Sequence, residues 1–255
     1  MQKRNKLINT KNKGFTLAEV LLTLGIISVV AALTIPTLVQ NQQEKAAVAA
    51  LKKSYSTLIQ AYTTAIQENG TPDNWDLISI GNETGLENLN KIMTSNLKVQ
   101  KNCQTGAGCF ATKYKDLIRS SAELYMDSAL YTKIILDDGT SVGFRQWDAT
   151  CMNNVSNIKN VCGIITVDIN GFKKPNQTGV DKFLFFFTKN TIVPSGIDMI
   201  AETHQYSFIN GCNITKPANA DWANGNSCTA WVIYNENMDY LKCSDLSWNS
   251  KNKCD

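Results

Sequence analysis

Residues 13–39 read KGFTLAEVLLTLGIISVVAALTIPTLV, and this stretch decides the fold. From Phe15 to Val39 nearly every residue is apolar, and a helix needs about 20 such residues to cross a bilayer core. The first 14 residues contain no acid and five basic residues, Lys3, Arg4, Lys6, Lys11 and Lys13. Because basic flanks stay in the cytoplasm, the sequence predicts a cytoplasmic leader and an exported remainder.

Two residues distinguish this segment from ordinary export signals. Glu19 places a carboxylate within the apolar run, at a cost of about 2.5–3.5 kcal/mol in a bilayer. Gly14 is a permissive residue at the junction of basic and apolar sequence. A secretory signal has a shorter apolar core that ends in a small-residue cleavage site, and neither is present. A plain signal anchor is an alternative, but it does not account for Glu19.

The residues KGFTLAE at positions 13–19 resemble the processing site of type IV prepilins and type II secretion pseudopilins. The resemblance implies that a prepilin peptidase cuts between Gly14 and Phe15 and then methylates the amine of Phe15. It also implies an assembly function for Glu19 and a helix-breaking proline at Pro36. The resemblance is confined to the N-terminal segment, and it does not identify the filament system.

The chemistry of the segment agrees with that resemblance. Cleavage would create a positive amine on Phe15, and Glu19 of a neighbouring subunit could pair with it. Pro36 removes a backbone hydrogen bond, so we expect the helix to kink or melt locally there. Small residues that would let other helices approach closely are Gly25, Ser28, Ala31 and Ala32.

The helical pattern continues beyond the apolar segment. An apolar stripe at steps of three and four predicts one helix from Thr16 to Glu68, which is about 80 Å long. The stop signal is Asn69-Gly70-Thr71-Pro72. We expect the second half of this helix to pack on a globular head. The stripe consists of Leu51, Tyr55, Leu58, Tyr62 and Ile66, and a second helix is predicted from Leu86, Leu89, Ile92, Met93 and Leu97.

Strand patterns begin at Tyr131. Residues 131–136 and 141–147 flank an Asp-Gly turn and predict a β-hairpin, and 163–169 and 182–188 predict two further strands. The apolar run 183–187 indicates a strand buried on both sides. The fold class is therefore α+β and type IV pilin-like, with the long helix covering an antiparallel meander of about four strands. The domains expected are a leader (1–14), an anchor and stem helix (15–68) and an extracytoplasmic headpiece (69–255).

All eight cysteines lie at or beyond Cys103, in the part predicted to be exported. An even number in an oxidising compartment indicates disulfides. Loop length alone favours nearest-neighbour pairs, and we expect a disulfide-tied C-terminal region on the edge of the sheet. The pairs are Cys103–Cys109, Cys151–Cys162, Cys212–Cys228 and Cys243–Cys254.

One internal loop concentrates oxygen ligands. Asp168, Asn170 and Asp181 are candidate calcium ligands, and the resemblance to pseudopilins supports a calcium-stabilised loop near this point of the fold. Lys173 and Lys174 put positive charge inside the loop, and no closing glutamate follows. The alternative is an Asx-turn in which Asp168 and Asn170 bond local backbone. No cofactor is required by any other motif.

The sequence carries no catalytic motif, so we expect no enzyme activity. The single histidine, His204, has no nucleophile motif beside it and is interpreted as a surface or interface residue. The function predicted is a structural subunit, a minor pilin or pseudopilin in the inner membrane and then in a periplasmic or extracellular filament. Its partners would be the prepilin peptidase, other pilin-like subunits, the assembly platform with its ATPase, and membrane lipid before assembly.

Two other functions are open. The head could be a binding module at a filament tip, such as an adhesin or a DNA-uptake pilin. It could also be an anchored extracytoplasmic domain that never polymerises. Without the five basic residues of the leader, the chain has 20 basic against 22 acidic residues, which counts against general affinity for nucleic acid. Secretion, motility, adhesion and competence systems share the N-terminal motif, so the sequence does not separate them.

Overall fold

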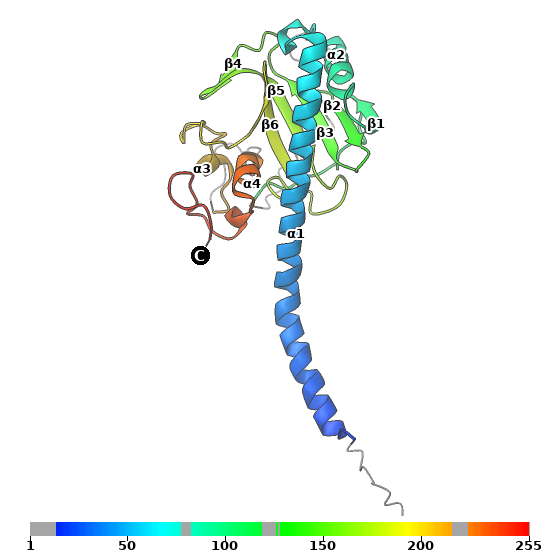
Figure 1. Ribbon diagram of the computed structural model, residues 1–255, viewed down its shortest axis with the longest axis vertical. Coiled ribbons are helices and arrows are strands. Elements are labelled where there is room, and N and C mark those ends of the chain that lie inside the picture. Colours follow the sequence, from blue (N-terminus) through cyan, green and yellow to red (C-terminus); the bar gives the residue numbers. More distant parts are fainter. Residues whose placement is uncertain (1–13, 78–82, 119–125, 127, 216–223, 255) are drawn as a thin grey trace, which may run out of the picture. The chain divides into compact units, whose positions relative to one another are not determined.

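The computed structural model describes residues 14–77, 83–118, 126, 128–215 and 224–254 (Figure 1). The chain divides into two compact units, Met1–Gln43 and Glu44–Asp255. The helix α1 (Leu17–Asn69) begins in the first unit and ends in the second. Its bounds lie within one residue of those predicted from sequence.

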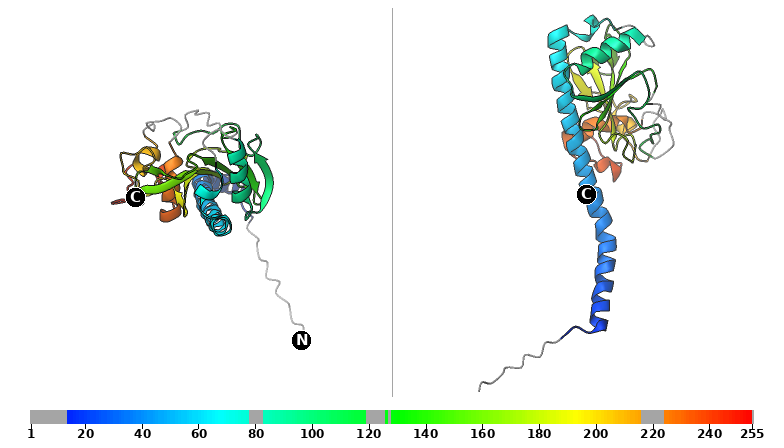
Figure 2. Two further views of the ribbon diagram at one scale, coloured as in Figure 1. Left: turned by 90° about the horizontal axis from the view of Figure 1, so that it is seen from above. Right: turned by 90° about the vertical axis from the view of Figure 1, so that its right-hand side faces the viewer.

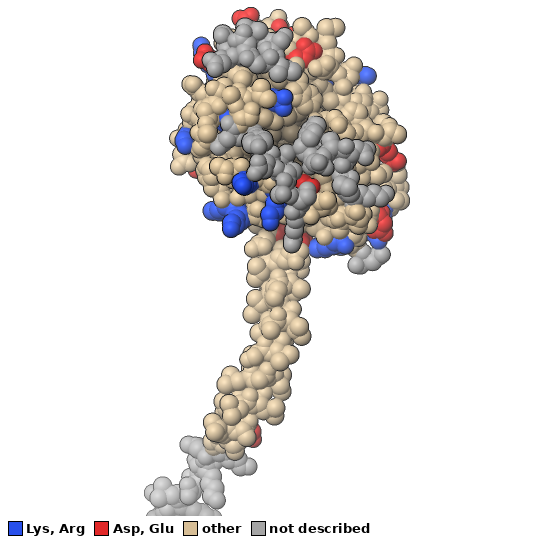
Figure 3. Space-filling view, turned by 180° about the vertical axis from the view of Figure 1, so that it is seen from behind, with Lys and Arg blue, Asp and Glu red and all other residues tan. Residues whose placement is uncertain are grey.

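The N-terminal part of α1 is apolar and exposed. Among the described residues, α1 is the one helix long and apolar enough to cross a membrane, and none of its most apolar window is buried. Charged atoms are nearly absent from its surface (Figure 3). Its hydroxyl groups bond to carbonyl oxygens three or four residues earlier, so they need no water. These pairs are Thr23 with Val20, Ser28 with Leu24, Thr34 with Val30, and Thr37 with Thr34.

The C-terminal part of α1 lies along one face of a β-sheet (Figure 2). The apolar stripe faces that sheet, and Leu51, Leu58 and Tyr62 are each at most 2% exposed. The Tyr62 ring meets the ring of Phe187 edge-on with centroids 6.3 Å apart. The stripe is therefore core packing, as the sequence predicted. The helix stops at Gly70, whose φ of +76° is left-handed.

The sheet has seven antiparallel strands, three more than the sequence predicted. The predicted hairpin and the two longer strands are present, but three short strands were missed. The order is β1 (Val99–Gln104), β2 (Thr132–Leu136), β3 (Ser141–Gln146), β5 (Ile158–Asp168), β6 (Lys182–Thr188) and β7 (Ile192–Pro194), and β4 (Asn153–Val155) pairs with β5.

Strand β6 is buried on both faces. All seven of its residues are buried. Phe183, Phe185 and Phe187 join the core beneath α1 and α2 (Glu83–Thr94). Leu184 and Phe186 pack in a second cluster on the opposite face. This arrangement explains the run of phenylalanines and confirms the interior strand predicted there.

The C-terminal region packs beside β6 and β7. It contains the helices α3 (Phe208–Gly211) and α4 (Thr229–Asn235) and the 3-10 turns η2 (Asn226–Cys228) and η3 (Asp239–Leu241); a further turn, η1 (Pro72–Asn74), follows α1. Ala230 N donates to Ser195 O at 2.9 Å, and Tyr240 Oη donates to Gly179 O at 2.7 Å. Leu184 N of β6 also donates to Thr229 Oγ1 of α4 at 3.0 Å, so the region is bonded directly to the sheet.

Four disulfides close local loops in the part of the chain after β1 begins. They join the same four nearest-neighbour pairs that loop length predicts. The pairs are Cys103–Cys109, Cys151–Cys162, Cys212–Cys228 and Cys243–Cys254.

Candidate processing and assembly site

Glu19 is held at the start of α1 by Thr16. The Thr16 backbone N and Oγ1 both donate to Glu19 Oε2 at 2.8 Å, and Glu19 N donates to Thr16 Oγ1 at 3.2 Å. Residues spaced S/T-x-x-E that bond reciprocally in this way form a capping box. The carboxylate therefore satisfies donors that the first helical turn leaves open. The sequence reasoning missed the contribution of Thr16, although the T-x-x-E spacing is its signal.

Gly14 and Phe15 lie just before this capping box. The Phe15 side chain is 88% exposed. A Cβ built on Gly14 would meet no atom within 4 Å, and Gly14 is not among the residues with positive φ. Nothing in the described fold therefore requires glycine at this position. A requirement for glycine there would have to come from another molecule that grips the backbone.

Pro36 lies inside α1 without interrupting it. The helix runs from Leu17 to Asn69 through the proline, so the local melting expected from sequence is absent. A proline removes only its own N–H bond, and residues on both sides keep helical bonding. The hydroxyl of Thr37 still donates to Thr34 O at 2.9 Å.

Comparison with protein families assigns this N-terminal segment. Residues 9–35 match the model described as the prokaryotic N-terminal methylation motif, so the chain carries a type IV pilin-like prepilin motif. The chain belongs to the family described as a family of unknown function (DUF6613), whose model matches residues 37–236. Comparison with curated proteins and with solved structures finds no match.

The predicted calcium ligands lie at the base of the connection between β5 and β6. Asp168 is fully buried and accepts hydrogen bonds from Tyr114 Oη and, at 3.1 Å, from Asn170 N. The bond from Asn170 N is the Asx-turn that the sequence offered as the alternative. Burial raises the pKa of Asp168 to about 7.

Asp181 already has three donors from the protein. Asn176 N, Gln177 N and Asn170 Nδ2 donate to its carboxylate at 2.7, 2.6 and 3.2 Å. Asn170 thus turns its nitrogen, not its oxygen, toward Asp181. The adjacent Lys182 is buried, and burial lowers its pKa to about 8. An amide nitrogen and a buried amine are not calcium ligands, whereas the buried Asn170 Oδ1 has no hydrogen-bond partner among the described residues, so the calcium site stays a prediction.

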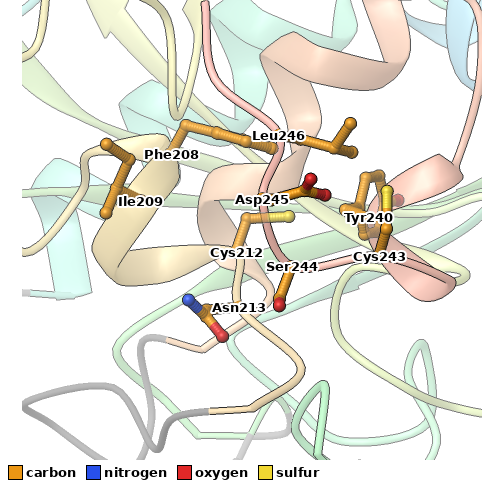
Figure 4. A pocket seen from close by; sticks show the side chains of 9 residues that line it. All are labelled: Phe208, Ile209, Cys212, Asn213, Tyr240, Cys243, Ser244, Asp245 and Leu246. Carbon is orange, nitrogen blue, oxygen red and sulfur yellow. The ribbon is translucent and has the colours of Figure 1, made fainter. Parts of the chain in front are cut away.

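Other chemistry-bearing groups are dispersed over the described part of the chain. No cluster of three or more His, Cys, Asp or Glu that could hold a metal occurs among the described residues. His204 is half-buried and stacks on Tyr206 with ring centroids 5.7 Å apart. A cavity of about 150 Å³ lies between α3 and residues 240–246 (Figure 4). Two of its lining residues, Cys212 and Cys243, are disulfide-bonded, so neither offers a nucleophilic thiol.

Proposed function

We propose that this chain is a structural subunit of a type IV pilus-like or type II secretion filament. A prepilin peptidase would cut it between Gly14 and Phe15 and methylate Phe15. The processed chain would then assemble through α1. The observation that carries this proposal is Glu19, the only charged residue from Phe15 to Val39, held by Thr16 at the start of an exposed apolar helix.

The capping box suggests how Glu19 is accommodated before assembly. In a single subunit in the bilayer, the carboxylate accepts hydrogen bonds from Thr16, so it is not buried without a hydrogen-bond partner. In a filament, the new amine of Phe15 on an adjacent subunit would supply an opposite charge. Because both groups sit in an apolar setting, their pairing would fix the axial register between subunits.

The rest of the anchor suits contact with other helices. A Cβ on Gly25 would meet no atom within 4 Å, so this glycine, like Gly14, serves no packing purpose within the described chain. Small residues at such positions let helices approach closely in a membrane. The remaining partners would be the assembly platform and its ATPase, and membrane lipid before assembly.

The proposal assigns a separate function to each of three segments of the chain. Residues 1–14 would be the cleaved leader, 15–68 the anchor and stem, and 69–255 an extracytoplasmic headpiece without chemistry of its own. A structural function agrees better with the prepilin motif than an enzymatic one does.

The first experiment is mass spectrometry of the mature N terminus after co-expression with a prepilin peptidase. A chain that begins at Phe15 and carries one added methyl group would support the proposal. A chain that keeps residues 1–14 beside an active peptidase would instead indicate a plain signal anchor.

Assembly is tested with Glu19→Gln, which keeps an oxygen to accept from Thr16 but removes the charge. We expect normal cleavage and membrane insertion, and a loss of filament yield of about tenfold or more, since an unpaired buried charge costs 1.4 kcal/mol or more. The measurement is the fraction of subunit in sheared, sedimented filaments.

The matched control for assembly is Thr23→Val, which removes a hydroxyl bonded only to Val20 O within the same helix. It should leave filament yield unchanged. Wild-type yield from Glu19→Gln would contradict the proposed pairing of Glu19. An empty filament fraction for the unaltered, processed chain would favour a domain that never polymerises.

A further inference from the structure

The connection between β5 and β6 presents an exposed apolar and basic tip. The Phe172 side chain is 55% exposed, and Lys173 and Lys174 follow it on the surface. Among the described residues, neither lysine ammonium has a hydrogen-bond or ion-pair partner. A large apolar side chain beside unpaired lysines is typical of surfaces that bind the interface of a membrane.

A third lysine lies next to this tip. The segment that carries Lys115 pairs with the chain just after the tip: Lys115 N donates to Asn176 O, and Thr178 N donates to Lys115 O, both at 2.9 Å. Lys115 is exposed, whereas its neighbour Tyr114 is buried. The Lys115 side chain therefore adds to the positive charge around Phe172.

The position of the tip along α1 follows from two contacts. Gly171 packs against Gly139 O in the β2–β3 turn, and Asp138 of that turn accepts from Lys53 Nζ at 2.6 Å. Tyr62, further along α1, bonds to Thr188 O at the opposite end of β6. From Tyr62 toward Lys53, that is, toward its N terminus, α1 therefore runs toward the end of the sheet that bears the tip.

Chain length then places this end near the bilayer. Glu44, the first residue of the globular unit, follows Val39, the last residue of the apolar segment, by five positions. Even a fully extended chain of that length spans only about 18 Å. The end of the globular unit that carries Glu44 and Lys53 is thus tethered beside the membrane surface in any subunit that is anchored there.

The charge at this end favours an anionic partner. Blue atoms gather toward the lower edge of the globular unit in Figure 3. Among the described residues, the nearby acids are Asp137 and Asp138, with Asp138 paired to Lys53, and the buried Asp116, Asp168 and Asp181. Because those three carboxyl groups are buried, the surface charge around Phe172 comes mainly from Lys115, Lys173 and Lys174.

We propose that Phe172, Lys173, Lys174 and Lys115 form a contact surface for anionic lipid headgroups. Phe172 would enter the interface while the three ammonium groups meet phosphate. The proposal rests on the membrane-anchored function above, since the tether supplies the proximity. It would orient the head on the bilayer before the subunit leaves for a filament.

The test is hydrogen exchange on the full chain in nanodiscs of phosphatidylcholine alone or mixed with phosphatidylglycerol. We expect residues 171–176 to exchange on the order of tenfold more slowly in the anionic discs, since each lysine near such a leaflet adds about fivefold to the contact. High salt and the double variant Lys173→Gln, Lys174→Gln should abolish this protection. The matched control is Lys159→Gln, an exposed lysine near the opposite end of β5, which should keep it.

Three outcomes would overturn the lipid surface. Equal exchange in both kinds of disc, with residues 15–39 protected, would remove the headgroup contact and leave the anchor intact. Protection by added duplex DNA but not by phosphatidylglycerol would assign the surface to nucleic acid. Unprotected residues 15–39 would overturn both this surface and the proposed membrane anchor.

Discussion

Asp168 carries a carboxyl group that is almost entirely withdrawn from water. Burial raises its pKa to about 7, and Tyr114 Oη donates to it. Burial also raises the pKa of Asp181 and of Tyr114, and it lowers the pKa of Lys182 to about 8. These four groups face one another at one end of β5 and β6, so the stability of this end depends on pH.

The pH dependence has a definite sign. Between about pH 4 and pH 7 the folded state binds the Asp168 proton and the unfolded state does not, so the free energy of unfolding falls as pH rises through this window. Each unit of pKa shift corresponds to about 1.4 kcal/mol. Asp168→Asn should flatten this slope in urea unfolding curves, whereas Asp137→Asn, in the exposed turn, should keep it. An unchanged slope in Asp168→Asn would contradict the assignment.

Gly196 tests the packing of the C-terminal region. Its φ is +85°, and a Cβ there would overlap the carbonyl oxygen of Ser227. Gly196→Ala should lower the free energy of unfolding by more than about 2 kcal/mol, measured by chemical denaturation. Gly139→Ala is the control, because its φ is +86° but a Cβ would meet nothing within 4 Å. Gly139→Ala should lower the free energy of unfolding only through backbone strain at a positive φ, by about 1 kcal/mol. Equal losses of unfolding free energy in the two variants would show that the structure shifts to relieve the overlap with Ser227.

Single residues differed in how far sequence could predict them. Gly14, Phe15 and Glu19 could be proposed from sequence because the pattern that marks them is local: a basic stretch, a glycine at its junction with the apolar run, and an acid within that run. The burial of Asp168 and Lys182 was not found, since it depends on strands that pair across distant sequence.

At the scale of elements, the β5–β6 connection allows a direct test of calcium. Asp181 accepts from Asn176 N, Gln177 N and Asn170 Nδ2, and these bonds do not require a metal. We therefore expect the melting temperature to be the same in calcium and in EGTA, measured by calorimetry at low ionic strength. A rise in melting temperature with calcium that Asp181→Asn abolishes would support the predicted metal site.

Long elements with clear periodicity were predicted well, and short strands were not. The apolar stripe from Leu51 to Ile66 correctly predicted which face of α1 is buried. β1 is largely exposed and polar, so its sequence lacks an alternating pattern. β4 and β7 have three residues each and form only because β5 and β6 offer them edges. Such strands are set by tertiary pairing rather than by their own residues.

At the scale of the whole molecule, four disulfides restrain the chain from Cys103 onward. The Cys212–Cys228 pair closes the longest of these loops, with a sequence separation of 16. Cys212→Ser with Cys228→Ser should therefore destabilise the protein by about 3 kcal/mol through loop entropy. Thermal unfolding under non-reducing conditions measures this. A loss no greater than that from Cys103→Ser with Cys109→Ser, whose separation is 6, would indicate that loop entropy does not set the effect.

The packing of α1 lengthwise on the sheet has a mechanical consequence. A pull on the N-terminal end of α1 loads the globular unit along the helix axis. The helix would then have to slide past Phe185 and Phe187 as a whole, because Leu51, Leu58 and Tyr62 are buried along several turns. Many contacts resist such shear together, whereas peeling would break them one at a time. The ion pair of Lys53 with Asp138 and the Tyr62 bond to Thr188 lie across the same sliding plane. In the proposed filament, tension would thereby be met by the protein's own hydrophobic core.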